Sequence, residues 1–197
     1  MRGKRSLAVA AALAVTAFGV AACGSDSSSS GSSDTSGASA DVGSVGVILP
    51  DSASSNRWET ADRKFLTDAF STAGVKADIQ NANGDKAKFA TIADGMIAGG
   101  CGVMAIVNLD SPSAAAVIKK ADAAGIPVID YDRLTLGGGA KYYVSFDNVA
   151  VGTAEGTGLV KCLNDAGVTS GPVALLNGSP TDNNATLFKQ GYEKAIK

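Results

Sequence analysis

Val103-Met-Ala-Ile-Val107 decides the fold, because it is an unbroken apolar run between two breaks in the pattern. Such a run is typical of a strand that is buried on both faces of a parallel sheet. Gly99-Gly100 ends the segment before it. Ser111-Pro112 opens the segment after it, with proline in the first turn of a helix. A strand buried on two sides and followed by a helix predicts a sheet that is covered by helices on both faces.

The alternation of short β-rich runs and longer amphipathic segments extends in both directions from this strand. Repeated strand–helix alternation predicts the α/β class, with a doubly wound parallel sheet. Helices are expected at 57–73, 85–98, 111–125, 149–163 and 184–196, and strands at 45–49, 77–80, 103–107, 126–129, 142–145 and 173–176.

Two groups of glycines lack the context of a nucleotide site. Gly137-Gly138-Gly139 is not followed by Lys-Ser/Thr and does not open a helix. Gly152, Gly156 and Gly158 fall inside an expected helix. We therefore expect a turn at the first group and close helix packing at the second, and no cofactor at either.

The N-terminal residues have the pattern of an exported lipoprotein. Basic residues at the start precede an apolar run over 7–22, whose end, Val20-Ala21-Ala22-Cys23, resembles the bacterial lipobox. We expect residues 1–22 to be a signal peptide, Cys23 to be lipidated, and the serine-rich stretch 23–41 to be a flexible tether. A plain cleaved signal and an uncleaved anchor are the alternatives, although the apolar run is short for a span of about 20 residues.

Composition narrows the classes of function. The chain has 17 basic and 19 acidic residues and no basic block, so we do not expect a nucleic-acid partner. It has no histidine, which excludes Ser-His-Asp and Cys-His catalysis and most catalytic zinc sites. We therefore expect neither a metal nor an enzyme of these classes.

Polar side chains gather where the expected strands end, and ligands of such sheets bind at the carboxyl ends of the strands. The residues there include Asp, Asn, Arg and the only Trp, but no Lys. Carboxylate, amide and guanidinium groups can each make two hydrogen bonds to adjacent hydroxyls of a polyol, and an aromatic ring can cover the C–H groups of a sugar. The candidate binding residues are Arg57, Trp58, Asp132, Arg133, Asp182 and Asn184.

Several of these residues have a structural alternative. Trp58 could be a core residue, and Asp132 could form a structural ion pair with Arg133. Arg57 and Arg133 at a carboxyl edge both need an anionic or polar partner. The residues that could instead cap the helix that follows them are Asp110, Asn148 and Asp182.

Five motifs resemble those of bacterial xylose-type sugar-binding proteins, the substrate-binding subunits of ABC importers of monosaccharides. The resemblance extends from about residue 45 to the C-terminus, with the motifs in family order. It implies the periplasmic binding protein-like I fold, in which two doubly wound α/β lobes are joined by a three-segment hinge and close around a sugar. The motifs are Asn56-Arg57-Trp58, Gln80-Asn-Ala-Asn-Gly84, Tyr131-Asp-Arg-Leu134, Tyr143-Val-Ser-Phe-Asp-Asn148 and Asn177-Gly-Ser-Pro-Thr-Asp-Asn-Asn-Ala185.

The resemblance also implies a division of the chain and a set of partners. Residues 42–148 would form a nearly complete first lobe, and residues 149–197 the start of a second lobe, so that the sequence is truncated at its C-terminus. The protein would be a lipid-anchored, extracytoplasmic monomer that binds D-xylose or a similar aldose and delivers it to an ABC permease, without a cofactor. All six candidate residues keep their binding role, with Trp58 as a wall of the site.

The two cysteines that follow Cys23 are not expected to form a disulfide with each other. Cys101 and Cys162 are expected near opposite poles of the fold, beyond the reach of a disulfide, whose Cα atoms must lie within about 7 Å of each other.

The alternative function is a secreted sugar-modifying enzyme on a similar sheet, in which Asp132 and Asp182 would act as an acid–base pair.

Overall fold

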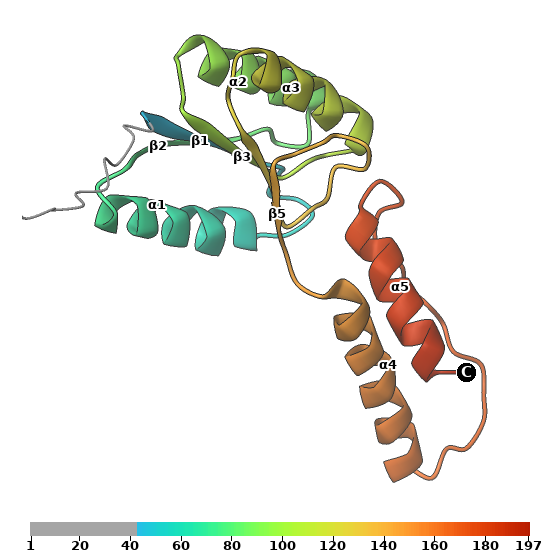
Figure 1. The fold of residues 1–197 in the computed structure, drawn as a ribbon. Coiled ribbons are helices and arrows are strands. Elements are labelled where there is room, and N and C mark those ends of the chain that lie inside the picture. Colours follow the sequence, from blue (N-terminus) through green and yellow to red (C-terminus); the bar gives the residue numbers. More distant parts are fainter. Residues whose placement is uncertain (1–42) are drawn as a thin grey trace, which may run out of the picture. The chain divides into compact units, whose positions relative to one another are not determined.

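The computed structural model describes residues 43–197, which form an α/β fold (Figure 1). The predictions of a signal peptide at 1–22, a lipidated Cys23 and a serine-rich tether lie outside the described residues. No helix within 43–197 has both the length and the apolar character that a membrane crossing requires. The elements are β1 (Ser44–Leu49), η1, a π-helical turn (Trp58–Asp62), α1 (Arg63–Thr72), β2 (Lys76–Asn81), α2 (Lys86–Ala98), β3 (Val103–Ile106), α3 (Ser111–Ala123), β4 (Val128–Tyr131), β5 (Tyr142–Val144), α4 (Asn148–Asp165) and α5 (Asn183–Ala195).

The strands form one parallel sheet in the order β2-β1-β3-β4-β5. The chain steps outward from β1 to β2 and then crosses back to β3, which is the doubly wound arrangement that the sequence predicts. Strand β3 pairs with β1 over Val45↔Val103 to Ile48↔Ile106, and with β4 over Met104↔Val128 to Ile106↔Asp130. Because all pairs are parallel, the carboxyl ends of the strands lie along one edge of the sheet.

Strand β3 is covered on both faces, as its apolar run predicts. Met104 packs in a buried cluster with Phe89 of α2 and Val117 of α3. Val107, directly after β3, packs in a second cluster with Leu66 of α1. Figure 1 accordingly shows α1 on one side of the sheet and α2 and α3 on the other.

Strand β4 and the first helix begin later than predicted. Strand β4 starts at Val128, because the N–H of Ile126 bonds the carbonyl of Ala121 at the end of α3 (2.9 Å), and Pro127 has no N–H. The first predicted helix is α-helical only from Arg63, because it opens with the π-helical turn η1. Such turns are rare and occur often at functional sites.

The predicted strand at 173–176 is wrong. These residues have irregular backbone, and the side chain of Leu176 is fully exposed. A strand needs a neighbouring strand for its N–H and C=O groups. Within 43–197 the strands all belong to the sheet that ends with β5, so the run at 173–176 has no partner there.

Helices α4 and α5 pack against each other at glycines. A Cβ atom on Gly152 would lie 2.1 Å from the carbonyl oxygen of Phe188, and one on Gly156 would lie 2.8 Å from the carbonyl oxygen of Tyr192. Close helix packing is therefore confirmed at these two glycines. It is wrong for Gly158, where a Cβ would meet nothing within 4 Å.

The structure shows a turn at the glycine triplet and no disulfide between Cys101 and Cys162. The N–H of Gly138 bonds the carbonyl of Thr135 at 3.0 Å, which closes the expected turn in the connection between β4 and β5. Cys101 is buried before β3 and Cys162 is exposed on α4, and both thiols are free. Burial raises the pKa of the Cys101 thiol.

Candidate functional site

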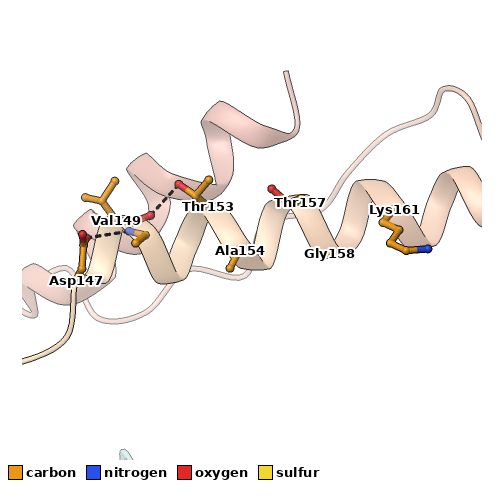
Figure 2. Close-up of a pocket in the computed structure, with 8 residues that line it drawn as sticks. Asp147, Val149, Thr153, Ala154, Thr157, Gly158 and Lys161 are labelled. Carbon is orange, nitrogen blue, oxygen red and sulfur yellow. Dashed lines mark hydrogen bonds between the residues drawn. The ribbon is translucent and has the colours of Figure 1, made fainter.

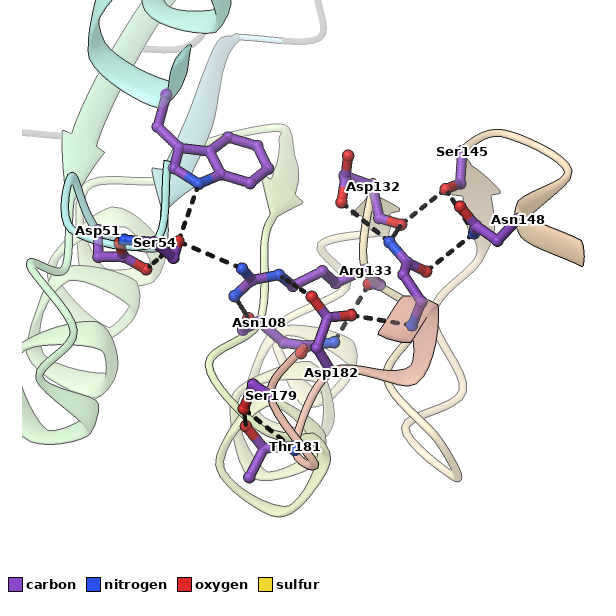
Figure 3. Close-up of polar contacts among 12 residues, drawn as sticks. Asp51, Ser54, Asn108, Asp132, Arg133, Ser145, Asn148, Ser179, Thr181 and Asp182 are labelled. Atoms are coloured by element: carbon purple, nitrogen blue, oxygen red, sulfur yellow. Dashed lines mark hydrogen bonds and ion pairs between the residues drawn. The ribbon is translucent and has the colours of Figure 1, made fainter. Parts of the chain in front are cut away.

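The structure places all six candidate residues at or near the carboxyl edge of the sheet. Figure 3 labels Asp132, Arg133 and Asp182 among them. Arg57 and Trp58 lie at the start of η1, after β1. Asp132 and Arg133 directly follow β4. Asp182 and Asn184 lie at the N-terminus of α5 rather than after a strand.

Contacts between different elements bring the five polar candidates together. Arg57 Nη2 pairs with Asp132 Oδ2. Arg133 Nε lies 2.9 Å from Asp182 Oδ2, and Asn184 Nδ2 donates to Asp132 Oδ1 at 3.1 Å. Asp132 and Arg133 are neighbours in sequence, but each takes its ionic partner from another element. The alternative of an Asp132–Arg133 ion pair is therefore wrong.

Trp58 lies against the guanidinium groups of both arginines. Trp58 is only 2% exposed and belongs to the buried cluster on the α1 side of the sheet. The guanidinium carbon of Arg57 lies 4.0 Å from the ring centroid, and that of Arg133 lies 5.7 Å away. Trp58 thus matches the core alternative, and it also holds two guanidinium groups by cation–π attraction.

Asp132 adopts a left-handed backbone conformation, with φ 66°, which is uncommon for any residue other than glycine. Three donors hold its carbonyl oxygen: Ser145 Oγ at 2.8 Å, Asn184 Nδ2 at 3.0 Å and Tyr143 OH at 3.2 Å. Strained backbone that neighbouring groups fix in this way is concentrated at ligand sites. The surrounding contacts therefore determine the direction of the Asp132 carboxylate.

Asn108 contacts Arg133, and Asp130 contacts Thr135 two residues further along the same segment; neither residue is a candidate in the sequence analysis. Arg133 Nη1 donates to the carbonyl of Asn108 at 3.2 Å, and Asn108 Nδ2 donates back to the carbonyl of Arg133 at 3.1 Å. Asp130 is fully buried and accepts from the N–H and the hydroxyl of Thr135, both at 2.7 Å. Burial raises the pKa of Asp130, and the two bonds from Thr135 act against that rise. The only sequence signal was that both residues lie at the ends of buried strands.

The capping alternatives have different outcomes. Asp110 caps α3 by accepting from the N–H of Ser113 at 2.8 Å, and Asp182 caps α5 by accepting from the N–H of Asn184 at 2.9 Å. Asp182 therefore combines a cap with its ion pair. Asn148 is not a cap, because the residue before it, Asp147, caps α4.

Two buried side-chain atoms of the described residues have no hydrogen-bond partner there, and both belong to this cluster. They are Arg133 Nε and Asn148 Oδ1. The Nε atom lies within 2.9 Å of Asp182 Oδ2 but does not donate a well-directed hydrogen bond to it. Buried polar groups are normally satisfied, and here Arg133 Nε has only its ion-pair partner Asp182, while Asn148 Oδ1 has no donor among the described residues.

A separate depression of about 790 Å³ lies along one face of α4 (Figure 2). None of the six candidate residues lines it. It is shallow and mostly apolar, and it has few groups that could orient a ligand. Its lining residues are Asp147, Val149, Ala150, Thr153, Ala154, Thr157, Gly158 and Lys161.

Tyr131 and Asp62 lie beside Arg57, and their hydrogen bond predicts how the stability of the protein depends on pH. Tyr131 OH donates to Asp62 Oδ1 at 2.6 Å, and Asp62 Oδ2 lies 3.7 Å from Arg57 Nε. Burial first, and then the bond to Asp62, raise the pKa of Tyr131 to about 12. An unfolded tyrosine ionises near pH ~10, so the unfolded state loses this proton first as the pH rises.

We therefore expect Tyr131→Phe to be less stable than the wild type below about pH 10, by roughly 1 kcal/mol for the lost hydrogen bond. Between about pH 10 and 12 the wild type should lose stability relative to the variant, because its folded state keeps a proton that its unfolded state has released. Urea unfolding of both proteins from about pH 8 to 11 measures this difference. A difference that stays constant across the series would contradict the raised pKa.

Comparison with known proteins identifies the family. A family model described as the periplasmic binding protein domain matches residues 45–197. A D-xylose-binding periplasmic protein of Escherichia coli (strain K12) is 34% identical over 141 residues, which are 72% of this chain and 41% of the relative. The multiple sugar-binding periplasmic receptor ChvE of Rhizobium radiobacter is 34% identical over 163 residues, which are 80% of this chain and 45% of the relative.

A solved structure supports the same assignment. The ABC transporter solute-binding protein of Clostridium phytofermentans, solved with bound β-D-glucose, is 33% identical with a TM-score of 0.71. The match covers 77% of this chain and 47% of that protein. The chain thus spans less than half the length of each of these three relatives. With a family model that matches residues 45–197, the chain belongs to the periplasmic binding protein domain family.

Proposed function

We propose that the protein binds a monosaccharide, D-xylose or a similar aldose, at the cluster around Asp132 and Arg133. The observation that carries the proposal is the buried Arg133 Nε–H, which makes no well-directed hydrogen bond among residues 43–197, lies 2.9 Å from the Asp182 carboxylate, and belongs to a guanidinium 5.7 Å from the Trp58 ring. The relatives named above, which are described as sugar-binding or were solved with a sugar, support the same ligand class.

The chemistry of the cluster fits a polyol. Asp132 and Asp182 offer carboxylate oxygens that accept from sugar hydroxyls, and Arg57, Arg133 and Asn184 offer N–H groups that donate to them. In the structure these donors and acceptors are paired with one another. A sugar can replace such pairs with hydroxyl contacts without leaving a buried charge unsolvated, since every group keeps a polar partner.

The proposed role is transport and not catalysis. Residues 42–148 would form one lobe, residues 149–197 would begin a second, and the sugar would favour the closed arrangement of the two. The bound sugar would then pass to an ABC permease. The predicted lipid on Cys23 would hold this extracytoplasmic protein, as a monomer, beside the permease.

A thermal-shift screen tests the ligand class. The whole protein that carries residues 43–197 would be heated with D-xylose, L-arabinose, D-ribose, D-glucose or D-galactose, and with mannitol as a polyol control. We expect at least one aldose to raise the melting temperature in a saturable way, because a ligand that binds only the folded state stabilises it. The sugar should be recovered unchanged afterwards. The proposal would be wrong if no sugar stabilises the protein, or if the sugar is converted to a product.

A further inference from the structure

A ring of four hydrogen bonds joins the candidate site to the start of α4 (Figure 3). Ser145 Oγ donates to the carbonyl of Asp132 at 2.8 Å, and Asn184 Nδ2 donates to the same carbonyl at 3.0 Å. Asn148 Nδ2 closes the ring by donating to Asn184 Oδ1 at 2.9 Å and to Ser145 Oγ at 3.4 Å. The ring thus connects the end of β4, the segment between β5 and α4, and the first turn of α5.

Asp132 fixes the direction of every bond in this ring. Its carbonyl and its ionised carboxylate can only accept, so Asn184 has to present its NH₂ group to them. The carbonyl oxygen of the Asn184 side chain then faces Asn148. Asn148 must present its own NH₂ group to that oxygen, and Ser145, which gives its proton to Asp132, can only accept from Asn148.

These bond directions leave Asn148 Oδ1 as an acceptor without a donor among the described residues. Asn148 is 3% exposed, and its Oδ1 has no hydrogen-bond partner among the described residues. A buried acceptor without a partner lowers stability, so an apolar side chain would serve packing alone better. Helix capping does not explain Asn148 either, because Asp147 caps α4. The one strong contact of its amide is the bond to Asn184.

We infer that Asn148 is a positioning residue, which holds the Asn184 carboxamide with its NH₂ edge toward Asp132 and the proposed sugar. This inference rests on the proposed function, since Asp132 and Asn184 belong to the proposed sugar site. It adds a rule of specificity: at Asn184 the ligand meets a hydrogen-bond donor, and beside it, at Asp132, an acceptor. A sugar hydroxyl at this point must therefore accept from one group and donate to the other.

Asn148→Asp tests the inference, because the substitution keeps the shape of the side chain and exchanges a donor for an acceptor. The new carboxylate would face the carbonyl oxygen of Asn184, so the Asn184 carboxamide would meet acceptors on both edges and would no longer be held with its NH₂ group toward Asp132. We expect the affinity for the best monosaccharide to fall about ten- to a hundredfold at pH 8, the cost of a buried polar contact that is lost. Isothermal titration calorimetry would measure it.

Acid should restore binding in this variant. Burial and the nearby Asp132 would favour protonation of the introduced carboxylate, whose O–H can replace the lost N–H donor, so the affinity should recover toward that of the wild type at about pH 5. A merely structural defect would not recover with acid. The wild type, titrated at both pH values, corrects for the charged and titratable groups around the ring, which are Arg57, Asp132, Arg133, Tyr143, Asp147 and Asp182.

Asn164→Asp is the matched control, since Asn164 is exposed on the same helix. It should bind the sugar as the wild type does at both pH values. Asn148→Asp protein that is folded and binds as tightly as the wild type at pH 8 would overturn the inference, and so would a loss of equal size at pH 8 and pH 5.

An NMR measurement separates this inference from the proposed function. In the sugar-free wild type, the Asn184 NH₂ protons should exchange slowly with solvent, because both are directed at Asp132 and the opposite edge is held by Asn148. Fast exchange there would overturn the positioning role, even if Asn148→Asp failed to fold. Slow exchange in a wild type that binds no sugar would instead support the positioning role and refute only the proposed function.

Discussion

Arg133→Ala is expected to lower the affinity for the best monosaccharide about a hundredfold or more, which is roughly 2.7 kcal/mol or above. The substitution removes the buried Nε–H donor that the proposed sugar would satisfy, and it leaves Asp182 without its ionic partner. It also removes the guanidinium above Trp58 and the bond to the carbonyl of Asn108. Hydrogen bonds to charged groups contribute about 1.5–3 kcal/mol each, so the loss of two is enough for this effect.

Two further variants sharpen this test. Arg133→Lys keeps the charge but loses the planar fork of donors, so it should bind with an intermediate affinity. Arg63→Ala removes an arginine from α1 whose Nε lies 2.6 Å from Glu59 Oε2, and it should leave sugar binding unchanged. A thermal shift in Arg133→Ala that equals that of the wild type would show that the site lies elsewhere.

Gly152→Ala is expected to lower the free energy of unfolding by about 3 kcal/mol, at the upper end of the usual cost of overpacking. The added Cβ would lie 2.1 Å from the carbonyl oxygen of Phe188, a backbone atom that cannot turn aside as a side chain can. Helices α4 and α5 would have to move apart. Because Asn148 and Asn184 lie at the adjoining ends of these helices, sugar affinity should fall as well.

Gly158→Ala is the matched control on the same helix. A Cβ there would meet nothing within 4 Å, and alanine is the better helix former by about 1 kcal/mol, so this variant should be as stable as the wild type or more stable. Urea unfolding of the three proteins, followed by circular dichroism, measures the effect. Equal stability of the two alanine variants would contradict the close packing of α4 on α5.

The architecture could be predicted because it depends on local patterns. The apolar run 103–107 indicated a strand covered on both faces, and β3 packs on α2 and α3 with one face and on α1 with the other. The run at 173–176 had a similar pattern and gave a wrong prediction. The two runs differ in their surroundings, since β3 lies between β1 and β4, whereas residues 173–176 have no neighbouring strand within 43–197.

The place of the candidate site could be predicted for a geometric reason, but its pairings could not. Parallel strands end along one edge, so residues that follow different strands are brought close in space. Whether Asp132 pairs with Arg133 or with the distant Arg57 depends on the direction of each side chain. The left-handed backbone of Asp132 sets that direction, and nothing in the sequence specifies it.

The supporting residues were missed because their importance depends on burial. Asp130 and Asn108 are both buried, and each holds the segment that carries Arg133 through hydrogen bonds to backbone or to Thr135. From the sequence alone, Asn148 was a possible helix cap. Its bond to Asn184, 36 residues away, becomes visible only when α4 and α5 are placed side by side.

Calorimetric titration of the whole protein with the aldose that the thermal screen selects measures whether the cluster around Asp132 and Arg133 binds a sugar. We expect saturable binding of one unmodified sugar per protein, and an affinity lower by about a hundredfold or more for the folded Arg133→Ala variant under the same conditions. Failure of every aldose to bind the wild type, or equally tight binding by Arg133→Ala, would contradict sugar binding at this cluster.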